Sequence, residues 1–297
     1  MPPPAVSRTS RRRAAAFVAL TKPRIIELLL VTTVPTMVVA QRGMPGLALI
    51  LATLVGGTLA AAGANTLNMY VDRDIDQLMN RTKGRPLVTG EVTPRQALAF
   101  AVALEVVAFV ELATLVNLLS AVLALSATLF YVFVYTIWLK RTSTQNIVIG
   151  GAAGAVPVLV GWASVTNRLD WAPFVLFAVI FAWTPPHFWA LAIKYREDYA
   201  AANVPMLPAV ASLAVTARRI LAYTLALWAL TLVFYWVGRM GTIYLGAALA
   251  LGALFTWHAY RLSQDSTAQR AMKLFGYSIT YVSLLFAAMA IDQLILR

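Results

Sequence analysis

Long uninterrupted stretches of this chain are apolar, and charged residues or Pro and Gly separate them. A bilayer core about 30 Å thick requires about 20 apolar residues in one helix. Stretches of this kind fall at 24–41, 46–69, 97–116, 118–138, 147–166, 171–193, 219–237, 242–260 and 274–294. The pattern therefore predicts nine membrane-spanning helices, with a break at Asn117 that divides one long apolar run into two spans.

The composition supports a membrane protein and argues against a soluble domain. Hydrophobic residues make up 60% of the 297 residues and charged residues 12%, against about 45–50% and about 25% in soluble domains. The predicted fold class is all-α, a polytopic helix bundle with two cytoplasmic loops that carry Asp residues. We expect residues 1–23 to form a basic cytoplasmic tail, because they lack the features of a cleaved signal peptide. Residues 24–297 are predicted to form one transmembrane domain.

Lysine and arginine residues concentrate on one side of the predicted membrane. Of the 24 such residues, the exceptions on the other side are Arg42, Arg168, Arg239 and Arg297. Because basic residues near helix ends stay in the cytoplasm, the N-terminus is predicted to be cytoplasmic and the C-terminus to lie across the cell membrane. The net charge of +12 does not indicate a nucleic-acid partner, since the basic residues lie between apolar spans rather than on one folded face.

The end of the second predicted span carries a stripe of oxygen-bearing side chains. Asn68, Asp72 and Asp76 recur every four residues, so a continuing helix places them on one face. Such oxygens suit a Mg²⁺ ion that shares substrate phosphate oxygens. Nearby basic residues, which are donors suited to phosphate, are Arg73, Arg81, Lys83 and Arg85. The pattern predicts a site for Mg²⁺ and diphosphate. The alternative is a solvated helix end whose charges pair with one another.

Two other cytoplasmic segments carry side chains of the same chemistry. Lys194 and Asp198 lie four residues apart in one segment, and Lys140 and Arg141 are adjacent in the other. We expect these segments to converge with the acidic stripe on one site for an anion and a metal. Asp74 lies off the stripe and is expected to meet an arginine of its own loop or solvent.

Two segments resemble a known family. NMYVDRDIDQLMNRTKGRPL, which starts at Asn68, resembles the first Asp-rich motif of the UbiA-type intramembrane prenyltransferases. WTPPHFWALAIKYREDYAAANVPMLP, which starts at Trp183, is similar to the branch of that family that farnesylates haem. The resemblance runs from about Leu20 to Asp292.

The resemblance implies a reaction and its participants. Mg²⁺ and basic residues would ionise farnesyl diphosphate, and the allylic cation would alkylate a vinyl group of haem b held in the lipid bilayer. Hand-over of the product to a downstream haem-modifying enzyme or to terminal oxidase assembly is a further expectation. Many members carry two acidic positions in the second motif, whereas this chain offers Lys194 and Asp198. Metal binding by Asp198 therefore stays open, and Lys194 is a candidate for diphosphate contact.

Two histidines and two tyrosines leave alternatives. His187 follows two prolines inside a predicted span, where an ionisable residue is functional by default. It is a candidate ligand of the haem iron or contact in the haem pocket, with an interhelical hydrogen bond or proton transfer as alternatives. His258 is a candidate second haem contact, although we favour an ordinary interfacial residue. Tyr131 and Tyr135 are expected either to stack on the allylic cation or to lie in an interfacial aromatic belt.

Two other functions are compatible with these observations. A prenyltransferase of the same kind could act on a small aromatic acid or a quinone precursor. A secondary transporter could use Asp72 and Asp76 for ion coupling. A transporter would place its acidic residues near the middle of the bilayer, whereas these lie at a helix end beside a phosphate-suited loop. The sequence therefore favours the enzyme.

Overall fold

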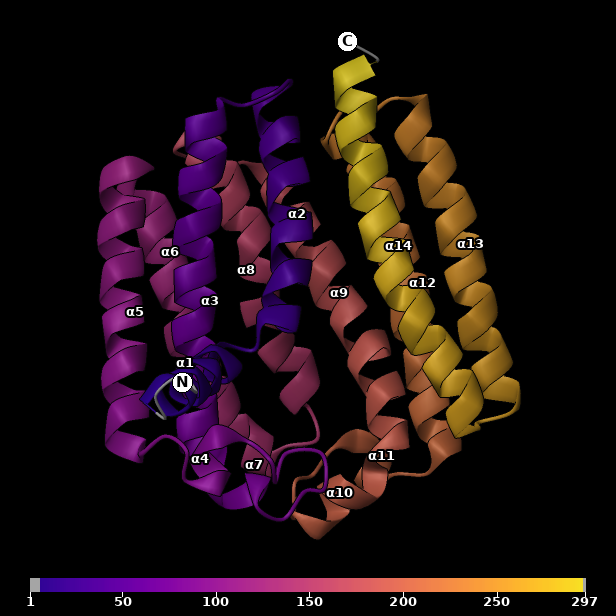
Figure 1. Ribbon diagram of the computed structural model, residues 1–297. Helices are drawn as coiled ribbons and strands as arrows, with labels where there is room; N and C mark the ends of the chain where they lie inside the picture. Colours follow the sequence, from indigo (N-terminus) through magenta and orange to yellow (C-terminus); the bar gives the residue numbers. More distant parts are fainter. Residues whose placement is uncertain (1–5, 296–297) are drawn as a thin grey trace, which may run out of the picture.

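The computed structural model describes residues 6–295, with side chains described for 12–23 and 31–295. Every element in this part of the chain is a helix, and the long helices run side by side between two ends of the molecule (Figure 1). Eight of them are long and apolar enough to span a membrane. They are α3 (Leu47–Asp76), α5 (Pro94–Leu115), α6 (Leu118–Leu129) continued by the π-helix η1 (Phe130–Leu139), α8 (Asn146–Thr166), α9 (Trp171–Lys194), α12 (Leu213–Val237), α13 (Thr242–Gln264) and α14 (Ala268–Ile295). The protein is therefore a multi-pass membrane protein.

Helix α2 (Pro23–Gln41) takes the place of the first predicted span, 24–41. The side chains of residues 24–30 lie outside the described part, and the apolar helical segment that is described there is Val31–Gln41. Eight of the predicted spans are thus confirmed by length and composition, and the count of nine stays a prediction.

Two helix starts in the first half of the bundle are fixed by side chains that cap them. Thr93 accepts a hydrogen bond from Gln96 N, and the Gln96 side chain accepts one from Thr93 N, so α5 begins with a capping box. Asn117 accepts a hydrogen bond from Ser120 N and donates one to Ala163 O at 2.8 Å. The predicted break at Asn117 is therefore confirmed, because α5 ends at Leu115 and the Asn117 side chain caps the start of α6.

The predicted N-terminal tail contains a helix, α1 (Val6–Thr21), that packs against α3. Leu20 is fully buried, and the ring of Phe17 meets that of Phe100 edge-on at 5.1 Å. Lys22 follows with a left-handed backbone (φ 52°), which turns the chain from α1 into α2. In Figure 1, α1 is seen nearly end-on across the long helices.

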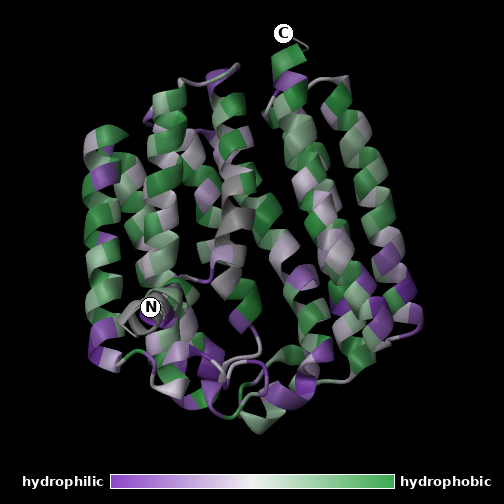
Figure 2. Ribbon diagram, viewed as in Figure 1, coloured by the Kyte–Doolittle hydropathy of each residue, from purple (hydrophilic) through white to green (hydrophobic). Residues whose placement is uncertain are grey.

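Polar residues gather at one end of the bundle, while the sides of the long helices are mostly hydrophobic (Figure 2). This polar end, as we call it, carries the short helices α4 (Pro86–Thr89), α7 (Lys140–Thr142), α10 (Arg196–Ala201) and α11 (Leu207–Val210). Exposed apolar side chains such as Val106 and Leu284 suit a surface in contact with lipid.

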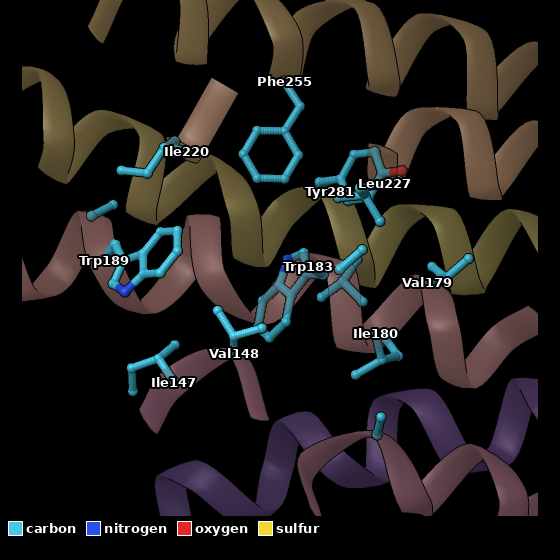
Figure 3. Close-up of a cluster of buried hydrophobic side chains, with 14 of the residues drawn as sticks. Ile147, Val148, Val179, Ile180, Trp183, Trp189, Ile220, Leu227, Phe255 and Tyr281 are labelled. Atoms are coloured by element: carbon cyan, nitrogen blue, oxygen red, sulfur yellow. The ribbon is translucent and has the colours of Figure 1, made fainter. Parts of the chain in front are cut away.

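Helix α9 lies at the centre of the main hydrophobic core. It packs against α8, α12 and α14, and α14 also contacts α2. Figure 3 shows Trp183 and Trp189 of α9 among Ile220, Phe255 and Tyr281 from the surrounding helices. Since these large side chains are buried, the residues of α9 between the two tryptophans are held in a fixed position.

Asp292, near the end of α14, caps the start of α13. Its carboxylate is 1% exposed and accepts hydrogen bonds from the backbone N–H groups of Gly241, at 2.5 Å, and Tyr244, at 3.0 Å. These are donors that a helix start leaves without a partner. The negative charge also suits the positive end of the helix dipole.

We expect Asp292→Ala to lower the thermal unfolding midpoint of the detergent-solubilised protein, by an amount corresponding to about 1–2 kcal/mol, because two helix donors lose their acceptor. Asp170→Ala is the matched control, since Asp170 stands before α9 without capping it. Equal midpoints for the two variants would contradict the assigned capping role.

Candidate active site

The carboxylate of Asp72 is the centre of the polar end. Asp72 is 0% exposed, and its Oδ2 accepts hydrogen bonds from Asn68 Nδ2 at 2.8 Å and from Lys140 Nζ. Asn68 also bonds Thr136 of η1 at 3.1 Å. Asn68, Asp72 and Asp76 are all buried on α3, which continues to Asp76. Their predicted position on one face is confirmed.

Asp76 is paired with a residue from the loop that follows it. Arg85 Nη1 lies 2.6 Å from Asp76 Oδ2, and Thr82 donates a hydrogen bond to Asp76 O at 3.0 Å. These contacts fold the loop back over the end of α3. Arg85 is therefore held beside the acidic stripe as expected.

Asp74 pairs with Arg141, so the expected partner from its own loop is wrong, whereas its side chain is 60% exposed and the expected contact with solvent is confirmed. The guanidinium of Arg141 makes two hydrogen bonds to the carboxylate of Asp74, at 2.7 and 2.8 Å. The partner comes from α7 because this short helix packs beside the end of α3. Arg141 thereby stands 3.9 Å from Asp72 Oδ1.

One oxygen of the stripe has no hydrogen bond. Asp72 Oδ1 is buried and lacks a hydrogen-bond partner among the described residues, and Arg141 is too distant to provide one. Leaving a buried carboxylate oxygen unsatisfied is costly, and a hard cation would satisfy it. The donor set of two carboxylates and an amide fits Mg²⁺ that takes its remaining ligands from water and phosphate. Within the described residues, no group of three or more His, Cys, Asp or Glu side chains could hold a metal.

Lys22 belongs to this cluster, although its position in the sequence does not indicate this. Its Nζ donates a hydrogen bond to Asn68 Oδ1 at 2.6 Å. Desolvation, followed by the like charges of Arg85 and Lys140, lowers the pKa of Lys22 to about 7. An anion bound here would oppose that effect. The local signal is Lys followed by Pro between two helices, which does not reveal where the side chain points.

Asp198 joins the second loop to the first. Its carboxylate accepts hydrogen bonds from Asn80 Nδ2 at 3.3 Å and from Arg81 N at 3.1 Å. The guanidinium of Arg81 lies 5.5 Å from the ring centroid of Tyr195. Burial raises the pKa of Tyr199, which lies in the same loop as Asp198. The predicted convergence of these two loops is confirmed.

Three of the predicted basic residues are exposed and lie outside this cluster. Arg73 donates to Tyr70 O at 2.5 Å, Lys83 donates to Asn80 Oδ1 at 3.0 Å, and Lys194 lies 5.5 Å from the ring of Tyr195. Arg73 lies off the stripe because successive residues of an α-helix are about 100° apart around its axis, and Arg73 directly follows Asp72. Their contact with diphosphate stays a prediction.

The π-helix η1 aligns two tyrosines beside the stripe. Thr136 donates a hydrogen bond to Tyr131 O, five residues earlier, at 2.8 Å and accepts one from Asn68. The rings of Tyr131 and Tyr135 stack with centroids 5.2 Å apart and planes at 16°. Gly150 of α8 leaves room for the ring of Tyr135, which a Cβ at that position would overlap. Helical π turns occur frequently at functional sites.

The two histidines occupy different environments. His187 is 8% exposed in α9, where its ring stacks on Trp183 at 4.3 Å and on Phe275 at 4.7 Å. Its Nδ1 lies 2.7 Å from Ser278 Oγ. His258 lies on α13 with its ring tilted against Tyr277 at 5.0 Å. The interhelical hydrogen bond considered for His187 is confirmed, and contact of either histidine with haem stays a prediction.

The fold and this polar end are those of an intramembrane prenyltransferase. The sequence matches the UbiA prenyltransferase family over residues 29–288, and the chain belongs to that family. It is 54% identical to the protoheme IX farnesyltransferase of Frankia casuarinae, over 95% of this chain and 99% of that protein. It is 53% identical to the enzyme of that name from Streptomyces coelicolor, over 94% of this chain and 91% of that protein.

Solved structures share the fold at low sequence identity. A digeranylgeranylglyceryl phosphate synthase superimposes with a TM-score of 0.78 at 15% identity, covering 95% of this chain and 98% of that chain. A UbiA homologue from Archaeoglobus fulgidus, bound to DMAPP and Mg²⁺, gives a TM-score of 0.65 at 15% identity, covering 91% of this chain and 99% of that chain. These likenesses concern the fold.

We expect Gly150→Ala to reduce the prenyl-transfer rate roughly tenfold, because the added methyl group displaces the ring of Tyr135 from its stack on Tyr131. Gly154→Ala is the control, since a Cβ at Gly154, one turn along the same helix, meets open space. Rates measured at saturating substrate check this. Equal rates for the two variants would show that the tyrosine stack does not depend on Gly150 or does not affect transfer.

Proposed function

We propose that the protein transfers the farnesyl group of farnesyl diphosphate to a vinyl group of protohaem IX, which yields haem o and diphosphate. The observation that carries this proposal is the buried Asp72 carboxylate with one unsatisfied oxygen, surrounded by cationic side chains at the end of an apolar bundle. The relatives that bear the name protoheme IX farnesyltransferase support the choice of acceptor.

The diphosphate is proposed to bind at the polar end. Asn68, Asp72 and Asp76 would hold Mg²⁺, which supplies positive charge to the departing diphosphate. Lys140 and Arg85, which pair with Asp72 and Asp76 in the structure, would exchange their carboxylate contacts for phosphate oxygens. Lysine and arginine suit this role because their hydrogen bonds to phosphate are assisted by charge.

The prenyl chain would extend from the diphosphate into the apolar bundle. Breaking the bond between farnesyl C1 and the diphosphate oxygen leaves an allylic cation, which the vinyl group attacks with its π electrons. The new carbocation beside the porphyrin then takes a water oxygen, and that water loses one proton. The faces of Tyr131 and Tyr135 would stabilise the allylic cation, and apolar surroundings would delay its capture by water.

The acceptor is proposed to lie against α9 with His187 as its contact. This histidine belongs to the central helix of the core, and its ring is fixed by stacking on Trp183 and Phe275. His258 would be a second contact from α13.

We further propose that the polar end faces the cytoplasm, where a water-soluble diphosphate is available, and that the C-terminus lies on the other side of the cell membrane.

Purified protein incubated with haem b, farnesyl diphosphate and Mg²⁺ should form haem o, detected by mass. We expect Asp72→Asn to lower kcat at least about 100-fold, because the buried negative charge that is proposed to hold Mg²⁺ is lost. Asp265→Asn is the matched control, since Asp265 is exposed and pairs with Arg270 away from this site. Full activity of Asp72→Asn would exclude the proposed metal site, and absence of haem o from wild-type protein would exclude the acceptor.

Lys22→Gln should raise the KM for farnesyl diphosphate about tenfold and leave the KM for haem unchanged, because it removes one charge-assisted contact to the diphosphate. Arg95→Gln controls for general loss of positive charge, since Arg95 is an exposed cation at the start of α5. Equal shifts in both KM values would assign Lys22 to folding rather than to diphosphate binding.

A further inference from the structure

Ser278 of α14 is fully buried and makes two short side-chain hydrogen bonds. Its Oγ lies 2.6 Å from the carbonyl oxygen of Phe275 and 2.7 Å from Nδ1 of His187. The backbone of the same residue is fixed as well, because Trp183 Nε1 donates to Ser278 O at 2.8 Å. Two residues of α9, four positions apart, thus bind one residue of α14.

These distances determine which nitrogen of His187 carries the proton. A hydroxyl group has one proton to donate. A carbonyl oxygen 2.6 Å from a hydroxyl oxygen requires that proton between them, since two oxygens at this distance would otherwise repel each other. The hydroxyl of Ser278 therefore donates to Phe275 O, and His187 Nδ1 must be the donor to Ser278 Oγ. Neutral His187 then has an unprotonated Nε2.

The Nε2 atom of His187 keeps an unused electron pair. Among the described residues, no hydrogen bond to it is found, whereas Nδ1 is engaged. The neighbouring rings of Trp183, Phe188 and Phe275 hold the imidazole by contact and leave its electron pair unused. An imidazole whose Nδ1–H is bonded to a fixed acceptor, with Nε2 free, has the arrangement of a metal-binding histidine supported by a second residue.

We propose that Ser278 is a positioning residue of the acceptor site, which fixes the His187 tautomer so that Nε2 binds the iron of the metalloporphyrin substrate. This rests on the proposed function, since haem is the iron-bearing acceptor there. The hydrogen bond to Ser278 makes Nδ1 richer in electrons and strengthens the bond from Nε2 to iron. Ser278 itself does not touch the acceptor.

The test combines haem spectra with the midpoint potential of bound haem b in the full-length protein in detergent. His187→Ala should lose the spectrum of histidine-bound haem, and added imidazole should restore it. Ser278→Ala should keep the histidine ligand but shift the midpoint potential of bound haem upward, because the imidazole then donates less electron density to ferric iron. The same variant should raise the KM for haem several-fold and leave the KM for farnesyl diphosphate unchanged. Thr280→Ala removes an exposed hydroxyl from the same helix and should shift neither quantity.

Ser278→Cys preserves side-chain size with a weaker acceptor, so it decides the question if Ser278→Ala does not fold. Unchanged potentials in the folded serine variants would overturn the role of Ser278. A His187→Ala spectrum identical to wild type would overturn iron binding at Nε2, and haem o formation by wild-type protein would then still support farnesyl transfer. Conversely, histidine-bound haem without any haem o formation would refute the transfer reaction and retain the inference about Ser278.

Discussion

The burial of the Asp72 carboxylate is the constraint on which the polar end depends. An isolated charge in an apolar bundle would be very unfavourable, so it must be paired and hydrogen-bonded. Lys140, 68 residues away in sequence, and Asn68 provide that environment. Because Lys140 directly follows η1, the same contact fixes the register of the π-helix and its two tyrosines. One buried charge thus connects α3, η1 and α7.

The bundle contains two chemically different environments. Charges are concentrated where α3 ends, whereas aromatic rings of α9 and α14 surround His187 inside the core. A prenyl diphosphate has the same division, with a highly charged head and an apolar chain. A substrate oriented by its head at the polar end would direct its reactive carbon toward the bundle. The proposed acceptor would then meet that carbon inside the bundle and need not approach the water-exposed loops.

The sequence was sufficient for features that depend on local periodicity. Eight spans were located, with bounds within about seven residues of the helix ends, because a bilayer requires apolar runs of fixed length. The stripe on α3 followed from a four-residue spacing. Contacts between distant segments were predicted less well. Lys22 was missed because its side chain is directed toward Asn68 by its own left-handed backbone between two helices, and the sequence does not indicate that conformation. The predicted partner of Asp74 was wrong because Arg141 comes from a separate helix. The π-helix was not predicted because η1 has 10 residues, too few for its wider turn to produce a distinct pattern of apolar positions.

The ion pairs of the polar end would also constrain a diphosphate that binds at the proposed site. Asp72 and Asp76 already neutralise Lys140 and Arg85, so an incoming anion must displace carboxylates from these cations. The displaced carboxylates would remain buried and negative beside the diphosphate, which is unfavourable unless they gain another cation. Lys22 contributes charge but cannot satisfy two carboxylates. A divalent cation that entered with the diphosphate would solve both problems at once, since it would compensate the carboxylates and hold the phosphate oxygens beside them.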